Sequence, residues 1–233
     1  MISLKTGFGR LLGGKKDYIE SGYVALLMLL VTIAYELFSK LVFADFSFNM
    51  YEFIGTWSGL VTVWLCRTQN VLCWPWGIVS AVMFGFFFET IGLPGQQWLN
   101  WGYFFVIQIW AWPNWAFGGE KRSALQVTFL SMKGKFLMFG GVVLGTALIY
   151  MLIDVFAPGS NYPVLDATVV ASSVVAQFLL GRKNVESWYL WLGPVNALSI
   201  ILFYLAGAYT VMALYIAFFI HALFAIKSWR AQV

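Results

Sequence analysis

Two tryptophans and an asparagine stand close together in an apolar stretch of the last third of the chain. Trp188 and Trp191 are three residues apart, so they share a helix face, and Asn196 follows about one and a half turns later. An indole ring stacks on flat rings and attracts cations, with a gain on the order of 0.5–2 kcal/mol. An amide both donates and accepts hydrogen bonds. Together these residues predict a binding site for a planar, neutral or positively charged molecule that carries hydroxyl or amide groups.

Other neutral polar residues also lie inside apolar stretches, where a polar group is costly unless it faces a partner or a water-filled cavity. Gln108 and Ser80 are expected at a depth similar to that of Asn196, with Asn100 nearer the outer surface. Further candidate ligands are Asn70, Asn184 and Gln177. Each of these groups could instead hydrogen-bond a neighbouring helix, and the two repeated asparagines could cap helices on the cytoplasmic side.

Charged residues limit the chemistry of this site. No Lys or Arg falls in the middle of a core stretch, although phosphate and carboxylate ligands normally require such a group or a helix terminus. Asp166 and Glu52 are expected at the outer mouth, where they would attract a cation. The sequence has no phosphate-binding P-loop, no Cys/His cluster and no paired acid and base at depth. We therefore expect a uniporter rather than an enzyme, with no metal, cofactor or nucleic-acid partner.

The composition places these residues in a membrane. The 233 residues are 61% hydrophobic and only 10% charged, whereas about a quarter of a soluble domain is charged. Stretches long enough to cross a bilayer are expected at residues 21–43, 48–66, 70–91, 97–117, 135–157, 164–180, 186–206 and 209–227. In the first of them, Glu36 and Lys40 leave open a helix that lies at the bilayer surface.

The basic residues orient these stretches. With eight spans, all Lys and Arg residues except Lys40 fall on the same side of the bilayer. The positive-inside rule makes that side cytoplasmic, with both termini inside.

An internal repeat organises the predicted helices. The pattern Asn-Val-x-x-Trp occurs at residues 70–74 and again 114 residues later, at 184–188. The same offset pairs Glu52 with Asp166 and Trp115 with Trp229. In an apolar chain, such a repeat indicates a transporter built from two halves around a central site.

The orientation predicts how the two repeats are joined. Three helices that start outside finish inside, so one extra helix at 135–157 must return the chain before a parallel second triplet. Pro75 and Pro194 are expected to interrupt the second helix of each triplet. We expect an all-α integral membrane protein of 3+1+3 helices plus an N-terminal helix. Its segments are 1–47 (basic segment and extra helix), 48–117 (first repeat), 118–163 (cytoplasmic loop and linker helix) and 164–233 (second repeat).

The second motif and its surroundings resemble the signature of the PnuC-type nicotinamide riboside transporters of bacteria. The resemblance covers residues 48–230 and is carried by 182–191 with Asn196, by 70–74, by Trp112 and Trp115, and by Asp166. It implies a core similar in plan to the sugar-transporting SWEET proteins, and a homotrimer in the bacterial inner membrane.

The resemblance also implies facilitated diffusion of nicotinamide riboside, made one-way by a cytoplasmic kinase that phosphorylates the riboside. Trp188 and Trp191 would stack on the pyridinium ring, and Asn196 would bind the ribose or the carboxamide. Gln108 and Asn100 would contribute from the opposite repeat. Close relatives in this family resemble thiamine or riboflavin transporters, so another flat vitamin, or a sugar, remains an alternative substrate.

Overall fold

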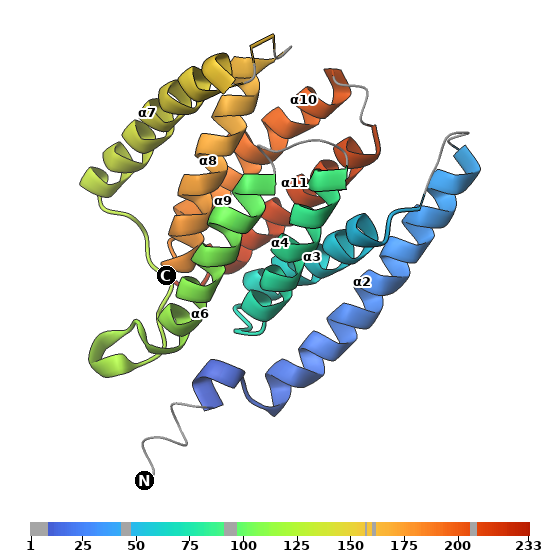
Figure 1. Ribbon diagram of the computed structural model, residues 1–233. Helices are drawn as coiled ribbons and strands as arrows, with labels where there is room; N and C mark the ends of the chain where they lie inside the picture. Colours follow the sequence, from blue (N-terminus) through green and yellow to red (C-terminus); the bar gives the residue numbers. More distant parts are fainter. Residues whose placement is uncertain (1–8, 43–47, 91–96, 157, 160–161, 206–208) are drawn as a thin grey trace. The chain divides into compact units, whose positions relative to one another are not determined.

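The chain folds into two compact units of helices, Met1–Leu125 and Gln126–Val233. The structure, a computed structural model, describes residues 9–42, 48–90, 97–156, 158–159, 162–205 and 209–233 (Figure 1). The first unit is called unit 1 below, and the second is called unit 2.

Unit 1 contains four main helical runs. They are α2 (Lys15–Val42), α3 (Met50–Thr68), α4 (Cys73–Thr90) and a run made of η1 (Leu99–Phe104) and α6 (Phe105–Phe117), followed by the short η2 (Glu120–Arg122). Within this unit α3 packs against both α2 and α4, and α4 packs against η1 and α6. Figure 1 shows α2 running along the other helices of its unit.

Small residues let the helices of unit 1 approach closely. A Cβ atom at Gly55 of α3 would lie 3.1 Å from the ring of Phe84, and one at Gly59 would lie 3.0 Å from Ser80 Oγ. The hydroxyl of Ser80 donates to the carbonyl of Gly55 at 2.9 Å. This GxxxG spacing is typical of packed membrane helices, and Ser80 adds a hydrogen bond between α3 and α4.

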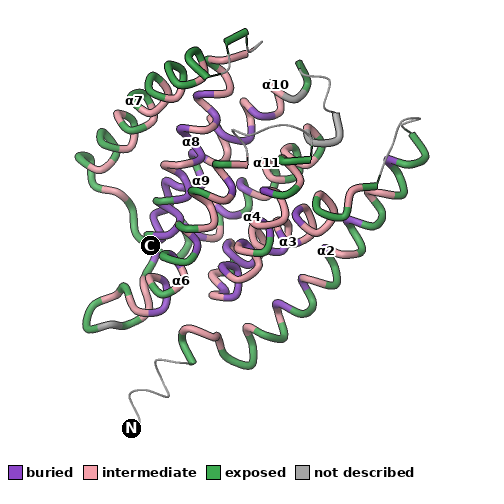
Figure 2. The backbone as a smooth tube through the Cα atoms, in the orientation of Figure 1, coloured by how far each residue is buried: buried purple, intermediate pink, exposed green. Residues whose placement is uncertain are grey.

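Unit 2 also contains four main helical runs. They are α7 (Met132–Phe156), α8 (Pro163–Gly181), the run α9 (Glu186–Leu190), η3 (Trp191–Ala197) and α10 (Leu198–Leu205), and finally α11 (Tyr209–Arg230). Many of the buried residues of this unit lie on α8, and this helix packs against α7, α9, η3 and α10. In Figure 2, α8 is largely coloured as buried, whereas α7 is not.

Helices occupy all eight expected stretches in the described part of the chain, with ends that differ by a few residues. The expected ends at 43, 91, 157 and 206 lie outside the described residues. The first helix begins earlier than expected, because α2 starts at Lys15 and Gly14 N donates to the carboxylate of Asp17 in its first turn. This bond satisfies one of the N–H groups that a helix start leaves without an intrahelical partner.

The expected interruption at Pro75 is wrong. Because α4 begins at Cys73, Pro75 lies in its first turn, where a missing N–H breaks no intrahelical hydrogen bond, and the helix continues to Thr90. Pro194 instead lies inside η3, a π-helical segment. The two proline sites therefore have different local structures.

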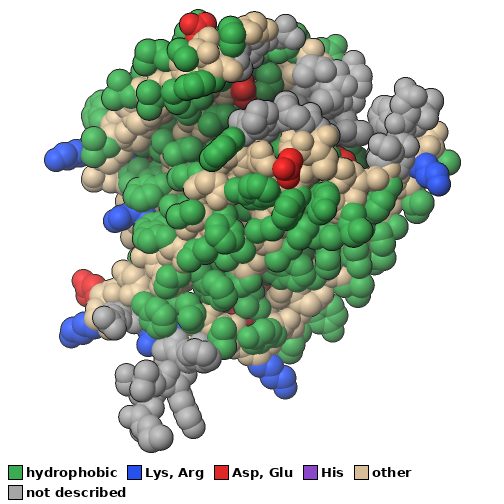
Figure 3. All heavy atoms as spheres, viewed as in Figure 1, with side chains coloured by type: hydrophobic (Ala, Val, Ile, Leu, Met, Phe, Trp, Pro, Cys, Tyr) green, Lys and Arg blue, Asp and Glu red, His purple; other side chains and the backbone are tan. Residues whose placement is uncertain are grey.

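Four helices in the described residues are long and apolar enough to cross a membrane: Gly9–Val42, Met132–Phe156, Pro163–Gly181 and Met212–Arg230. No residue of α7 is buried, and large apolar side chains such as Phe136, Leu144 and Phe156 are exposed along it. Hydrophobic side chains cover most of the face in Figure 3. Such a surface requires an apolar surrounding, which lipid provides.

Candidate functional site

The two copies of the Asn-Val-x-x-Trp motif form the same backbone turn. Each preceding helix ends in a left-handed residue, Gln69 with φ 61° and Lys183 with φ 55°. The backbone N–H of the motif asparagine then donates to a carbonyl of the helix, from Asn70 N to Leu65 O at 2.9 Å and from Asn184 N to Leu179 O at 3.0 Å. The left-handed residue adds a second bond, from Gln69 N to Cys66 O at 3.2 Å and from Lys183 N to Leu180 O at 3.0 Å. Both copies therefore have a Schellman-type helix end, with the left-handed residue directly before the motif asparagine.

The tryptophan of each motif packs against the tryptophan that follows 41 residues later. Trp74 meets Trp115 edge to face at 4.9 Å and 87°, and Trp188 meets Trp229 at 5.6 Å and 85°. At most 3% of any of these four side chains is exposed. The repeated tryptophans are therefore parts of the packed core of each unit.

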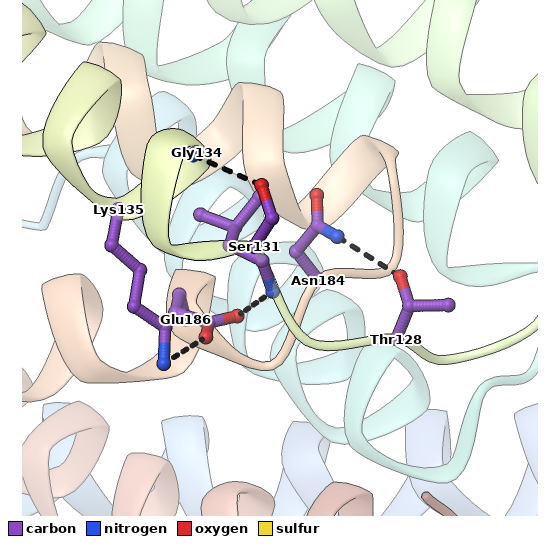
Figure 4. Close-up of polar contacts among 7 residues, drawn as sticks. Thr128, Ser131, Gly134, Lys135, Asn184 and Glu186 are labelled. Atoms are coloured by element: carbon purple, nitrogen blue, oxygen red, sulfur yellow. Dashed lines mark hydrogen bonds and ion pairs between the residues drawn. The ribbon is translucent and has the colours of Figure 1, made fainter.

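The repeated asparagines are bound to other parts of their own units. Asn70 Oδ1 accepts from Leu72 N at 3.0 Å, while its Nδ2 donates to Asp17 O at 2.9 Å and to Glu20 Oε2 at 3.0 Å. Asn184 Nδ2 donates to Thr128 Oγ1 at 3.0 Å (Figure 4). The structure thus places both side chains in structural turns, in agreement with the capping alternative for Asn70.

Two of the buried polar atoms that lack a partner among the described residues lie in the η3 segment of unit 2. Asn196 is 2% exposed, and its Oδ1 has no hydrogen-bond partner among the described residues. The indole Nε1 of Trp191, at the start of η3, is likewise buried without a partner there. An unsatisfied buried polar group costs about 1–3 kcal/mol, and π-helical segments are frequent at functional sites. These two side chains are available to hydrogen-bond a bound molecule.

A comparable amide group in unit 1 is that of Gln108 in α6. Gln108 is 5% exposed, and its Oε1 has no partner among the described residues. Gly77 of α4 makes room for it, since a Cβ atom there would overlap Gln108 Oε1. Asn100, in the π-helical η1, is also buried. The spacing of Gly77, Ala81 and Gly85 on α4 is the sequence signal that could have indicated this close packing.

The other candidates lie elsewhere in the two units. Gln177 is buried on α8, and Ser80 is committed to the bond with Gly55. Glu52 and Asp166 occupy the first turns of α3 and α8, where a negative charge favours the helix start.

The site residues do not follow the repeat. At the offset of 114 residues, Gln108 corresponds to Ala222 and Asn196 corresponds to Val82. Gly77, which makes room for Gln108, corresponds to Trp191. Unit 1 therefore has a glycine and a glutamine at the two positions where unit 2 has a tryptophan and an alanine. Gln108, Trp191 and Asn196, whose side chains each keep an atom without a partner among the described residues, thus stand where the two units differ.

Comparison with known proteins assigns the chain to a family. The sequence profile of the nicotinamide mononucleotide transporter family matches residues 49–231. The chain belongs to this family. The relatives that this chain resembles are named as transporters and not as enzymes, and the expected likeness to PnuC-type transporters is confirmed.

Several members of the transporter family are similar over most of the chain. The nicotinamide riboside transporter PnuC of Escherichia coli (strain K12) is 24% identical over 208 residues, which are 79% of this chain and 86% of that protein. PnuC of Neisseria mucosa is 22% identical over 187 residues, 76% of this chain and 70% of that protein. The riboflavin/roseoflavin transporter RibM of Streptomyces davaonensis is 26% identical over 145 residues, 60% and 66% of the two chains.

A solved structure shares the fold of this family member. The crystal structure of the vitamin B3 transporter PnuC superposes with a TM-score of 0.72 and 21% identity, and the match covers 97% of this chain and 96% of that one. The expected all-α membrane-transporter fold is thereby confirmed.

Proposed function

We propose that this chain takes up nicotinamide riboside by facilitated diffusion. The observation that carries the proposal is a pair of buried groups on η3, Asn196 Oδ1 and Trp191 Nε1, which have no hydrogen-bond partner in the described part of the chain. An aromatic face with amide groups suits a pyridinium ring that bears a carboxamide and a ribose. The names of the relatives, two nicotinamide riboside transporters and a riboflavin transporter, support a flat, ring-containing substrate.

The distribution of charge favours the riboside over the phosphorylated mononucleotide. The Lys and Arg residues on the described transmembrane helices lie in first or last turns, as Lys40, Arg67 and Lys135 do. A phosphate monoester would enter these helices without a cation to pair with, at a cost of several kcal/mol.

The membrane arrangement is part of the same proposal. Two parallel three-helix repeats, joined by α7 and preceded by α2, would place both termini in the cytoplasm of a bacterial cell. The matched turns and Trp pairs at one offset support the repeats. A homotrimer in the inner membrane, and trapping of the riboside by a cytoplasmic kinase, rest on the family resemblance.

Uptake into proteoliposomes tests the proposal. Labelled nicotinamide riboside should accumulate to equilibrium without ATP or a proton gradient. Excess unlabelled riboside should compete, whereas nicotinamide mononucleotide, thiamine and glucose should not. Asn196→Leu and Trp191→Ala should reduce uptake, while Trp98→Ala, which removes a 74% exposed side chain, should not. Uptake that is absent, or equal in all three variants, contradicts the proposal.

Riboflavin is the second candidate because RibM is among the relatives. A labelled riboflavin arm in the same vesicles separates the two. Riboflavin uptake that the riboside fails to inhibit would assign the site to the larger flavin ring.

A further inference from the structure

Thr128, in the segment before α7, is hydrogen-bonded to the turn between α8 and α9. Thr128 N donates to Lys183 O at 3.1 Å, and Val185 N donates to Thr128 O at 3.0 Å, which makes a single parallel β-bridge. The side chain of Asn184 adds its bond to Thr128 Oγ1. Three hydrogen bonds thus join the repeated motif to the entry of α7.

A buried carboxylate strengthens this attachment. Glu186, in the first turn of α9, is 4% exposed. Its Oε2 accepts from Leu130 N at 2.9 Å, and its Oε1 lies 3.4 Å from the ammonium of Lys135 in α7 (Figure 4). Loss of such partners would leave a buried charge uncompensated. These contacts of Asn184 and Glu186 with Thr128, Leu130 and Lys135 are called the unit 2 clasp.

Unit 1 has an attachment at the same place in its turn. Asn70 Nδ2 donates to Asp17 O and to Glu20 Oε2, and both partners lie at the start of α2. Trp76 Nε1 adds a bond to Ser21 Oγ at 2.9 Å. The bonds of Asn70 to Asp17 and Glu20 are called the unit 1 clasp. The carboxylate of the unit 1 clasp, Glu20, lies on α2, whereas that of the unit 2 clasp, Glu186, lies in the first turn of α9 within the repeated motif.

The inward faces of α2 and α7 agree in register. The buried residues of α2 include Val24, Met28 and Thr32. At the offset of 114 residues, these positions are occupied by Met138, Val142 and Thr146, which lie on the less exposed side of α7. Met138 and Val142 pack against the buried cluster of unit 2 around Ala176, Leu179, Leu190 and Val195. Residues at equivalent positions of the two helices therefore face the rest of their own units.

We propose that α2 is the counterpart of α7, and that the two clasps fasten these helices to their units in equivalent ways. The inference rests on the repeat in the proposed function and extends it from three helices to four. Each unit then consists of a clasped helix followed by a three-helix bundle. The N-terminal helix is a structural part of unit 1, and each clasped helix moves together with its motif turn during transport.

Two buried positions serve as matched reporters of the clasps. Cys73 is fully buried, and its backbone N–H bonds to Asn70 O at 3.1 Å. Ser187 is equally buried at the corresponding place, and its N–H bonds to Asn184 O at 3.1 Å. Cys66→Ala leaves Cys73 as the reporter thiol of unit 1. Cys66→Ala with Cys73→Ser and Ser187→Cys moves the reporter to unit 2. The measurement is the rate of thiol labelling of the full chain in lipid vesicles without substrate.

Each clasp should protect its own reporter only. Glu20→Ala removes a hydrogen bond to a charged group, so labelling of Cys73 should accelerate on the order of tenfold while the unit 2 reporter is unchanged. Thr128→Val combined with Lys135→Met should accelerate the unit 2 reporter by a similar factor and leave Cys73 unchanged. The control Glu89→Ala, which alters an exposed carboxylate of unit 1, should change neither.

Three outcomes overturn the inference: no acceleration, equal acceleration of both reporters by either variant, or an effect of Glu89→Ala as large as that of Glu20→Ala. Because labelling needs no substrate, it is independent of the uptake assay. Selective labelling without riboside uptake would retain the clasps and reject the transport substrate. Riboside uptake with unselective labelling would retain the transport substrate and reject the clasps.

Discussion

The indole rings of Trp188 and Trp229 meet edge to face, with centroids 5.6 Å apart and planes at 85°. Trp74 and Trp115 meet in the same manner 114 residues earlier. The residues that recur in both halves of the sequence are thus those that pack each unit. Asn196 and Gln108, which we propose as substrate ligands, have Val82 and Ala222 as counterparts and do not recur. This division between packing and binding leads to distinct expectations for the two groups.

Trp229→Ala should destabilise the protein strongly. The side chain is fully buried against Trp188, and removal of such an indole typically costs about 3–5 kcal/mol. The midpoint of thermal unfolding in detergent, followed by tryptophan fluorescence, should fall sharply. Trp98→Ala is the control because that indole is exposed. Equal midpoints in the two variants would show that the Trp pair does not stabilise unit 2.

Asn196→Leu should impair transport without a loss of stability. The change removes a buried oxygen that has no partner among the residues the structure describes, and it keeps a similar volume, so the free energy of unfolding should shift by less than about 1 kcal/mol. Loss of one or two hydrogen bonds to the substrate should raise the half-saturation concentration for uptake by about 10- to 100-fold.

Asn70→Leu provides the opposite case to Asn196→Leu. It removes three hydrogen bonds of a structural turn, so its main effect should be a lower unfolding midpoint. Should Asn196→Leu lower the midpoint as much as Asn70→Leu does, Asn196 would be a packing residue.

Gly77→Ala should reduce uptake even though alanine favours a helix. A Cβ at residue 77 would overlap Oε1 of Gln108, so the amide must move away from its position. The control is Gly22→Ala in α2, where a Cβ meets no atom within 4 Å. That control should stabilise the protein by about 0.5–1 kcal/mol and leave uptake intact. Full uptake by Gly77→Ala would exclude a role for the observed Gln108 geometry.

Gln69→Gly should stabilise the turn after α3. Gln69 adopts φ 61°, a left-handed conformation that costs a residue with a side chain about 1 kcal/mol and a glycine nothing. The unfolding midpoint should rise slightly, and Gln69→Ala should show no such rise. A midpoint lowered by Gln69→Gly would mean that side-chain contacts of Gln69 outweigh the backbone strain.

Much of the fold follows from the order of residue types along the chain. Long apolar stretches with charges at their ends predict helices in a bilayer, and the eight helical runs in the described residues occupy those stretches. The motif at residues 70–74 and 184–188 was visible because side chains that form one turn keep a constant spacing. Neutral amides at depth likewise indicated Asn196 and Gln108, since a polar group is rare in such a setting.

The roles of those residues depend on contacts between segments far apart in the sequence. The spacing of Trp188, Trp191 and Asn196 predicts one binding face. In the fold, the ring of Trp188 packs on Trp229. Trp188 Nε1 and Asn196 Oδ1 have no partner among the described residues. Pro75 and Pro194 look alike in sequence, but only the helix start at Cys73 makes Pro75 harmless.

The sequence by itself therefore determined the class of protein, its helices and the list of polar residues that require an explanation. It could do so because hydrophobicity and periodicity are local properties. The tertiary structure alone decided which of those residues are satisfied: Asn70 by α2, Ser80 by α3, and Glu186 by α7 and the segment before it. Hydrogen-bond satisfaction depends on which distant groups folding brings within about 3 Å, and spacing along a chain does not contain that information.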